Sequence, residues 1–177
     1  MGQNIKVLAR DPGDLRETEL QDFIALVRAG GEVGGNVLEH NVRNAATLLT
    51  VRQGACLVGV AALKNPIWSY RKTITAKSGI EITARDFPFE LGYIFVLPSA
   101  RKKGIATKLC QVAVGARGSV GIFATTRVDN ESMTNILRAV GFEQRGRFYT
   151  SRRGNFRLQL FLRQRGLATP PVAVKAK

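Results

Sequence analysis

Apolar residues recur along this chain with two periods, the period of about 3.6 residues of an amphipathic helix and the two-residue period of a strand. The helical period is clear in residues 14–29, where Asp14 is the predicted N-cap and Glu17 follows three residues later, as in a capping box. The strand pattern is clearest in residues 89–97, which are rich in aromatic and β-branched residues and stop at Pro98.

The rest of the pattern predicts the element order of a mixed α/β domain. Two strand pairs are each joined by a short turn, one at Gln53-Gly54 and the other at residues 152–154. Residues 65–87 have no clean period, and we predict a partly helical excursion there, which is either an insertion on the substrate side or a merely structural segment. The predicted strands are 4–9, 46–51, 55–63, 89–97, 121–126, 142–150 and 155–162, and the predicted helices are 14–29, 36–44, 107–116 and 130–140.

Length and composition limit the classes of protein to which this chain can belong. At 177 residues the chain suits one core, so we expect one domain, residues 1–163, followed by a basic disordered tail, residues 164–177. No apolar run approaches the roughly 20 residues of a membrane helix, which favours a cytoplasmic protein without a membrane partner. Cys56 and Cys110 lie in apolar segments and are expected to be buried thiols. With His40 as the single histidine they cannot form a four-ligand zinc site, so no metal is expected.

Positive charge is concentrated in the second half of the chain. The net charge is +14, but residues 1–90 carry 11 Lys/Arg against 10 Asp/Glu, whereas residues 91–177 carry 16 against 3. A one-sided excess of this size favours a polyanionic partner, either a phosphate-rich cofactor or nucleic acid. A solvated surface that needs no partner is the alternative.

The basic turn after the strand 89–97 is the main candidate for a binding site. Strand, glycine-containing turn, helix and strand follow one another as in a βαβ unit, whose turn exposes backbone N–H groups at the start of a helix. Residues 101–106 read Arg-Lys-Lys-Gly-Ile-Ala, so amide donors and mobile cations would meet a diphosphate together, and Gly104 would let the backbone approach closely. The turn has neither the Walker pattern nor the glycine pattern of dinucleotide-binding folds.

At these residues the sequence resembles the GCN5-related N-acetyltransferase (GNAT) superfamily. The run 101–106 fits the family's acetyl-CoA pattern Arg/Gln-x-x-Gly-x-Gly/Ala, and residues 91–98 are similar to the family's central strand. A helix between Asn130 and Gly141-Phe142 is a second family feature. The resemblance covers residues 4–163 and implies a GNAT-like α/β (α+β) fold: a mixed, mostly antiparallel sheet, splayed at the central strand and flanked by helices.

The resemblance also implies how acetyl-CoA is held as a cosubstrate. Main-chain groups of the central strand would pair with the pantetheine arm, and amides of the turn would hold the diphosphate. Lys102 and Lys103 would reach the 3′-phosphate, and Asn130 would lie near the acetyl or pantetheine end. The implied cofactor-binding residues are Phe95, Val96, Leu97, Arg101, Lys102, Lys103, Gly104, Ile105, Ala106, Thr107 and Asn130.

Acetyl transfer further needs a base for the acceptor amine and a proton for the departing thiolate. Glu90 is the base candidate, because some family members carry a glutamate eleven residues before the arginine of the turn. A strand-end glutamate paired with a nearby arginine is the equal alternative. Leu137 stands where many members carry a tyrosine as the acid, which leaves Ser132 and Tyr149 as candidates for the acid or for a contact with the sulfur.

The implied function is transfer of acetyl from acetyl-CoA to an acceptor amine that the sequence does not identify, with the acceptor approaching between residues 68–86 and 148–156. The alternative is a nucleic-acid-binding protein of the same fold with weak or lost catalysis, or acetylation of an RNA-linked amine. Family members often pair through terminal strands, so a monomer and a homodimer are both open. The alternative function rests on a basic, aromatic final hairpin with Arg145, Arg147, Phe148, Tyr149, Arg152, Arg153, Phe156 and Arg157.

Overall fold

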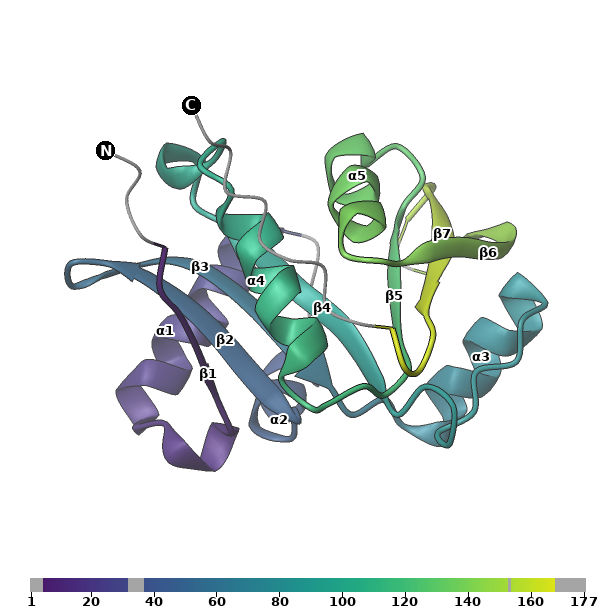
Figure 1. Ribbon diagram of the computed structural model, residues 1–177, viewed down its shortest axis with the longest axis horizontal. Helices are drawn as coiled ribbons and strands as arrows, with labels where there is room; N and C mark the ends of the chain where they lie inside the picture. Colours follow the sequence, from purple (N-terminus) through teal and green to yellow (C-terminus); the bar gives the residue numbers. More distant parts are fainter. Residues whose placement is uncertain (1–4, 32–36, 153, 168–177) are drawn as a thin grey trace.

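The computed structural model describes residues 5–31, 37–152 and 154–167, which form one seven-stranded sheet with helices on both faces (Figure 1). The strand order is β1-β2-β3-β4-β5-β7-β6, and the expected mixed, mostly antiparallel sheet is confirmed. The strands are β1 (Val7–Arg10), β2 (Thr47–Gln53), β3 (Cys56–Lys64), β4 (Phe89–Val96), β5 (Ile122–Arg127), β6 (Glu143–Thr150) and β7 (Arg157–Arg163). The helices are α1 (Glu17–Ala29), α2 (Val37–Arg43), α3 (Trp68–Ser78), α4 (Ile105–Gly115) and α5 (Glu131–Ala139), with 3-10 turns η1 (Pro12–Asp14) and η2 (Pro98–Ala100).

The sheet opens between β4 and β5. These two strands are parallel, and within the described residues their register holds just two pairs, Phe89 with Ile122 and Glu90 with Phe123. Beyond Glu90 the strands diverge, as Figure 1 shows. The opening therefore separates the antiparallel strands β1 to β4 from the antiparallel strands β5, β7 and β6.

A bulge in β4 lies next to this opening. Val60 is opposite Phe95 and Ala62 is opposite Gly92, so β4 holds one more residue than β3 between these two pairs. Tyr93 lies in the bulge with a φ of 54°, which is uncommon for a bulky residue. Because the extra residue shifts the alternation of side chains, Leu91 packs in the cluster under α4, whereas Tyr93, two residues later, packs with Phe95 against the cluster beneath α1.

Helices cover both faces of the sheet. In Figure 1, α4 crosses in front of β2, β3 and β4, while α1 and α2 lie behind them. One apolar cluster joins the sheet to α4 and α5, and a second joins it to α1 and α2. A third cluster packs Ile74 of α3 against Phe123 and Leu160 of the strands beyond the opening. The first turn of α4 follows the end of β4, so it lies at the edge of the opening.

The prediction of Asp14 as the N-cap of α1 is wrong. Pro12–Asp14 forms η1, and α1 begins three residues later at Glu17. Arg16 is the N-cap residue, and its backbone N–H donates to the Glu19 carboxylate at 3.1 Å. A short 3-10 turn precedes the helix, so the capping pattern lies at Arg16 and Glu19 and not at Asp14 and Glu17.

The two cysteines lie in different environments. Cys110 of α4 is buried in the core, and burial raises the pKa of its thiol to about 12, which leaves it protonated and unreactive at neutral pH. Cys56 is exposed at the start of β3, so the expectation of a buried thiol is wrong there. The strand was predicted correctly, but its first residue lies beyond the part of the sheet that the helices cover.

The described chain ends with contacts to the body of the domain. The Gly166 amide donates to the Ser119 carbonyl at 2.9 Å, and Arg163 donates to the Leu167 carbonyl at 2.7 Å. Residues 168–177 of the predicted tail lie outside the described residues. None of the helices that the structure describes is both long and apolar enough to cross a membrane.

Gly121 sits against the backbone of the loop before β4, and we expect Gly121→Ala to destabilise the protein. A Cβ at this position would overlap the Asp86 carbonyl oxygen and lie 3.1 Å from the ring of Phe87. Such overpacking costs about 1–3 kcal/mol, which in a chain of this size corresponds to a melting temperature lower by roughly 2–12 °C. Gly13→Ala is the control for thermal denaturation, because no atom lies within 4 Å of a Cβ there. Equal melting temperatures for the two variants would contradict the packing.

Candidate active site

The turn between β4 and α4 presents a row of backbone N–H groups. Lys102 and Gly104 have positive φ values of 61° and 77°, and α4 begins at Ile105, two residues before its predicted start. Within the described residues, the amides of residues 102–107 donate to no hydrogen-bond acceptor. Free amides at a helix N-terminus favour an anion, because the donors and the helix dipole act together.

The charged side chains of this turn divide into two groups. Arg101 folds back onto β4, where its Nε donates to the Val96 carbonyl at 3.0 Å and its guanidinium lies 5.5 Å from the centre of the Phe95 ring. Lys102 and Lys103 are exposed. Arg101 therefore braces the turn against the strand, whereas the two lysines are available to a phosphate.

Some of the main-chain groups of β4 that were predicted to bind the pantetheine arm already form hydrogen bonds within the protein. The Val96 carbonyl accepts the Arg101 side chain, and the Leu97 amide donates to the Val58 carbonyl at 2.9 Å. On its other side, β4 has no strand pairing beyond Glu90 within the described residues. An extended ligand with amide groups fits along that unpaired side, and the roles of Phe95, Val96 and Leu97 stay predictions.

Glu90 is the centre of a polar cluster at the point where the strands part. Its side chain is 3% exposed, and Lys64 Nζ lies 2.7 Å from Oε2. Oε1 accepts hydrogen bonds from the Tyr70 hydroxyl at 3.0 Å and the Thr125 hydroxyl at 3.3 Å. The predicted ion pair of Glu90 therefore exists, but its partner is a lysine on β3 and not an arginine.

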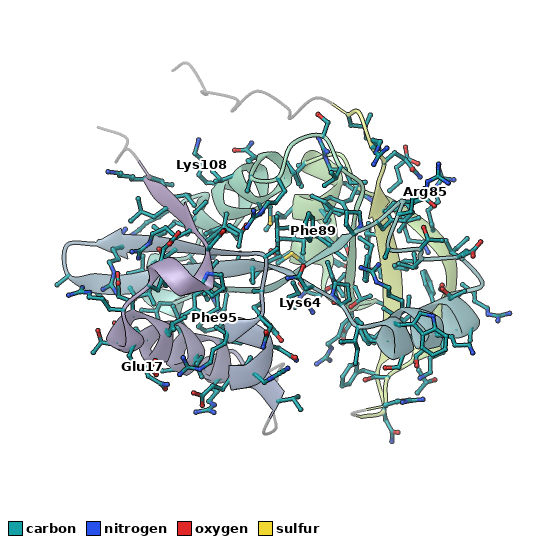
Figure 2. All side chains as sticks on the ribbon, turned by 90° about the horizontal axis from the view of Figure 1, so that it is seen from below. Glu17, Lys64, Arg85, Phe89, Phe95 and Lys108 are labelled. Carbon is teal, nitrogen blue, oxygen red and sulfur yellow. The ribbon has the colours of Figure 1, made fainter. Side chains whose placement is uncertain are left out.

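Four structural elements meet in this Glu90 cluster: Lys64 comes from β3, Glu90 from β4, Thr125 from β5 and Tyr70 from α3. Figure 2 shows Lys64 between the half of the molecule that carries α1 and the half that carries α3. A Cβ on Gly92 would lie 2.8 Å from Cε of Lys64, so the glycine makes room for the lysine. The cluster places a carboxylate and an amine together at the inner end of the opening.

Two tyrosines surround Glu90 and keep their protons. Burial and the charge of Glu90 raise the pKa of Tyr149 from 10 to about 12. The same two causes raise the pKa of Tyr70 well above 10. The structure therefore brings Tyr149, a predicted acid candidate, near the predicted base, and it adds Tyr70, which the sequence analysis missed. Each of these phenols is a hydrogen-bond donor at neutral pH.

Tyr149 makes the free energy of unfolding depend on pH in the alkaline range. Because its pKa is raised in the folded state, the unfolded chain loses the phenolic proton first. The stabilisation is therefore complete below pH 10 and is lost as the pH rises towards 12. We expect the free energy of unfolding in urea to fall by about 1–2 kcal/mol more in the wild type than in Tyr149→Phe over this range. If the free energy of unfolding fell equally with pH in the wild type and in Tyr149→Phe, the raised pKa of Tyr149 would be contradicted.

The candidates on α5 are placed differently. Asn130 is the N-cap of α5, and its Oδ1 accepts the Met133 amide at 3.0 Å. Ser132 is exposed on the first turn. Leu137 is 1% exposed and packs in the core, so this position faces away from any ligand. Contacts of Asn130 and Ser132 with acetyl-CoA stay predictions.

The predicted approach of the acceptor between residues 68–86 and 148–156 is closed at the end of α3. Lys77 Nζ donates to the Thr150 carbonyl at 3.0 Å, and Arg147 donates to the carbonyls of Lys77 and Ala76 at 2.9 and 3.0 Å. A long segment next to a strand looked like one wall of a channel, but its helix packs directly on β6. This prediction is corrected.

The first turn of α3 is open to solvent. Ile67 and Trp68 are 69% and 71% exposed, and Lys72 Nζ lies 4.6 Å from the centre of the Trp68 ring. The Tyr70 ring is 37% exposed while its hydroxyl reaches Glu90. These side chains form an exposed surface, and the Tyr70 hydroxyl connects it to the buried Glu90 carboxylate.

Some of the basic side chains of the final hairpin bond to other residues of the protein. Arg145 pairs with Glu143 at 2.5 Å, and Arg147 is bonded to α3. Arg157 lies 5.2 Å from the centre of the Phe148 ring, which is 40% exposed. Arg153 lies outside the described residues. Binding of nucleic acid by this hairpin stays a prediction.

Comparisons with known proteins agree with this arrangement. The sequence model of the acetyltransferase (GNAT) family matches residues 15–142. No curated protein sequence matches the chain. The fold is similar to that of a GNAT-family acetyltransferase from Streptococcus agalactiae, with a TM-score of 0.66 and 14% identity over 94% of this chain and 99% of that one.

Two further solved structures are similar. One is NAA60 from Arabidopsis thaliana in complex with acetyl-CoA, with a TM-score of 0.66 and 15% identity over 90% of this chain and 98% of that one. The other is ElaA from Escherichia coli, with a TM-score of 0.65 and 11% identity over 90% of this chain and 99% of that one. At such identities the structures support the fold alone.

Proposed function

Because the chain belongs to the acetyltransferase (GNAT) family, we propose that it is an N-acetyltransferase that moves an acetyl group from acetyl-CoA directly to an acceptor amine where β4 and β5 diverge. One observation carries the proposal. The opening between these strands has free amides at the start of α4 and a buried carboxylate, Glu90, at its inner end. The amides at one end of the opening thus suit the diphosphate of an acyl-CoA, and the carboxylate at the other end suits the reaction at its thioester.

The residues present fit acetyl-CoA as the cosubstrate. The amides of residues 102–107 would hold the diphosphate, and Lys102 and Lys103 would pair with the remaining phosphate charge. Gly104 leaves open space above the turn, since no atom lies within 4 Å of a Cβ there. The unpaired side of β4 would hold the arm that leads to the thioester. Acetyl-CoA supplies an activated acyl group, so the chain needs no acyl-enzyme step.

Glu90 is the proposed base. The acceptor amine must lose a proton to attack the thioester carbonyl, and Glu90 is the carboxylate at the point where the strands part. Because Lys64 already pairs with Glu90, an acceptor has to compete with this lysine for the carboxylate. The departing thiolate takes up one proton. Tyr149 is the proposed donor, because its raised pKa keeps it protonated.

A CoA-release screen tests the proposal. Small amines, peptides and aminoacyl-RNA are incubated with acetyl-CoA, and free CoA is separated and measured by chromatography, because the exposed Cys56 would interfere with thiol reagents. Release above the hydrolysis blank in one acceptor class, with acetyl found on that acceptor, is the expected result. Deacylated RNA is the matched control for the RNA arm. No release with any class, although acetyl-CoA binds, would favour a binding protein.

A further inference from the structure

The amine of Lys64 stands where the proposed function requires an acceptor amine, and we propose that the protein acetylates this lysine itself. This inference rests on the proposed function, because it uses the same acetyl-CoA site and the same carboxylate. Lys64 Nζ lies 2.7 Å from Oε2 of Glu90. Among the described residues, no other lysine amine forms an ion pair with a carboxylate.

The position of Lys64 at the inner end of the opening makes it reachable by a bound thioester. Its partner Glu90 belongs to the last pair that joins β4 to β5, and Thr125 of β5 donates to the same carboxylate from across the opening. The lysine is 20% exposed, so its side chain is neither sealed in the core nor free in solvent. The amine is thereby held at the site at a high effective concentration.

The surroundings of Lys64 place its amine between a glycine and two aromatic rings. Gly92 has no Cβ, and one placed there would lie 3.1 Å from Nζ. The rings of Tyr93 and Tyr70 have their centres 4.9 and 5.9 Å from Nζ, on the side where the bulge turns Tyr93. The four-carbon side chain is flexible, so the amine can move from Glu90 towards the opening without a change in the backbone.

The chemical step balances without any further reactant. The Lys64 ammonium gives one proton to Glu90, and its nitrogen then forms a bond to the thioester carbonyl carbon while the carbon–sulfur bond breaks. The nitrogen then loses its second proton to solvent, and the thiolate takes one proton from Tyr149, which solvent reprotonates. Glu90 releases its proton to solvent, so the products are acetyl-lysine, CoA and one proton. Acetylated Lys64 has lost its charge, so Glu90 keeps the hydroxyls of Tyr70 and Thr125 but no cation.

Mass spectrometry of the full chain tests this inference. The purified protein, first treated with a lysine deacetylase, is incubated with acetyl-CoA, and acetylation is followed by intact mass and peptide mapping. Lys72 is the matched control, since it is exposed on α3 and would react first in a non-enzymatic reaction. We expect Lys64 to be modified roughly tenfold faster than Lys72 or more, with a rate constant independent of protein concentration. Equal rates, or a faster rate at Lys72, would overturn the inference.

Two variants separate this inference from the proposed function. In Lys64→Arg, which keeps the positive charge, we expect the fast acetylation to disappear while the slow acetylation of Lys72 is unchanged. If the wild type acetylates external amines and leaves Lys64 unmodified, the inference fails and the proposed function stands. In Gly104→Val, loss of the fast reaction at Lys64 together with loss of external transfer would show that both use one acetyl-CoA site, and survival of the Lys64 reaction would contradict it.

Discussion

Gly104→Val is expected to abolish acetyl-CoA binding while the protein stays folded. Gly104 has a φ of 77°, a conformation that costs a residue with a Cβ about 1–2 kcal/mol and a β-branched residue more. Valine would therefore turn the amides of the α4 N-terminus away from their present directions. Its methyl groups would also occupy the open space above the turn, where a diphosphate has to approach.

The effect of this change is measured by calorimetric titration with acetyl-CoA. We expect Kd to rise by about 100-fold or more, equivalent to about 2.7 kcal/mol of binding free energy. The matched control is Gly118→Val, because Gly118 also has a positive φ, 72°, and open surroundings, but lies beyond the other end of α4. Both variants should lose similar stability in thermal denaturation. Unchanged binding in Gly104→Val would remove the assignment of the turn as the diphosphate site.

The phosphate turn could be predicted because its signal is local. A glycine, neighbouring lysines and a helix start lie within six residues, and each has its own backbone preference. The order of strands around the turn was equally readable from period and turn residues, whereas the opening at the central strand was expected only from the resemblance to the family. The details that a local pattern does not carry are the start of α1, where η1 intervenes, and the first turn of α4.

The Glu90 cluster could be predicted only in part because its contacts are distant in sequence. Tyr70 and Lys64 are 20 and 26 residues from Glu90, and Thr125 is 35 residues away. Nothing in the sequence distinguishes Lys64 from any other lysine at the end of a strand. The bulge at Tyr93 gave no signal either, since tyrosine rarely adopts a positive φ and the surrounding residues read as an ordinary strand.

The same difficulty explains the corrected approach of the acceptor. Residues 65–87 were expected to be a substrate-side insertion because they precede the central strand and have no clean period. Whether such an insertion lines a channel or packs on the sheet depends on contacts such as those of Arg147 with Lys77 and Ala76, 70 and 71 residues apart. The exposed Trp68 at the other end of α3 is visible only once the helix is placed.

Glu90→Gln is the second change with a large expected effect, a fall in turnover of about 10²–10⁴-fold, the usual loss when a general base is removed. Glutamine keeps the shape of the side chain and an oxygen that can accept from Tyr70 and Thr125, but it cannot take a proton. The acetyl-CoA Kd should stay unchanged, because the phosphate turn follows the other end of β4. Steady-state CoA release with the acceptor found in the screen gives the turnover, and Glu143→Gln, at an ion pair on β6, is the control.

The charge of Lys64 complicates this variant, and a double variant resolves it. Removing the charge of Glu90 leaves a mostly buried ammonium without its carboxylate, so Glu90→Gln is expected to lose stability as well as activity. Lys64→Met in the same chain removes that unpaired charge and keeps an unbranched side chain that is one atom shorter. We expect the double variant to regain stability in urea denaturation and to remain inactive. If activity returned together with stability, Glu90 would serve only to neutralise Lys64, and the base would have to be sought elsewhere.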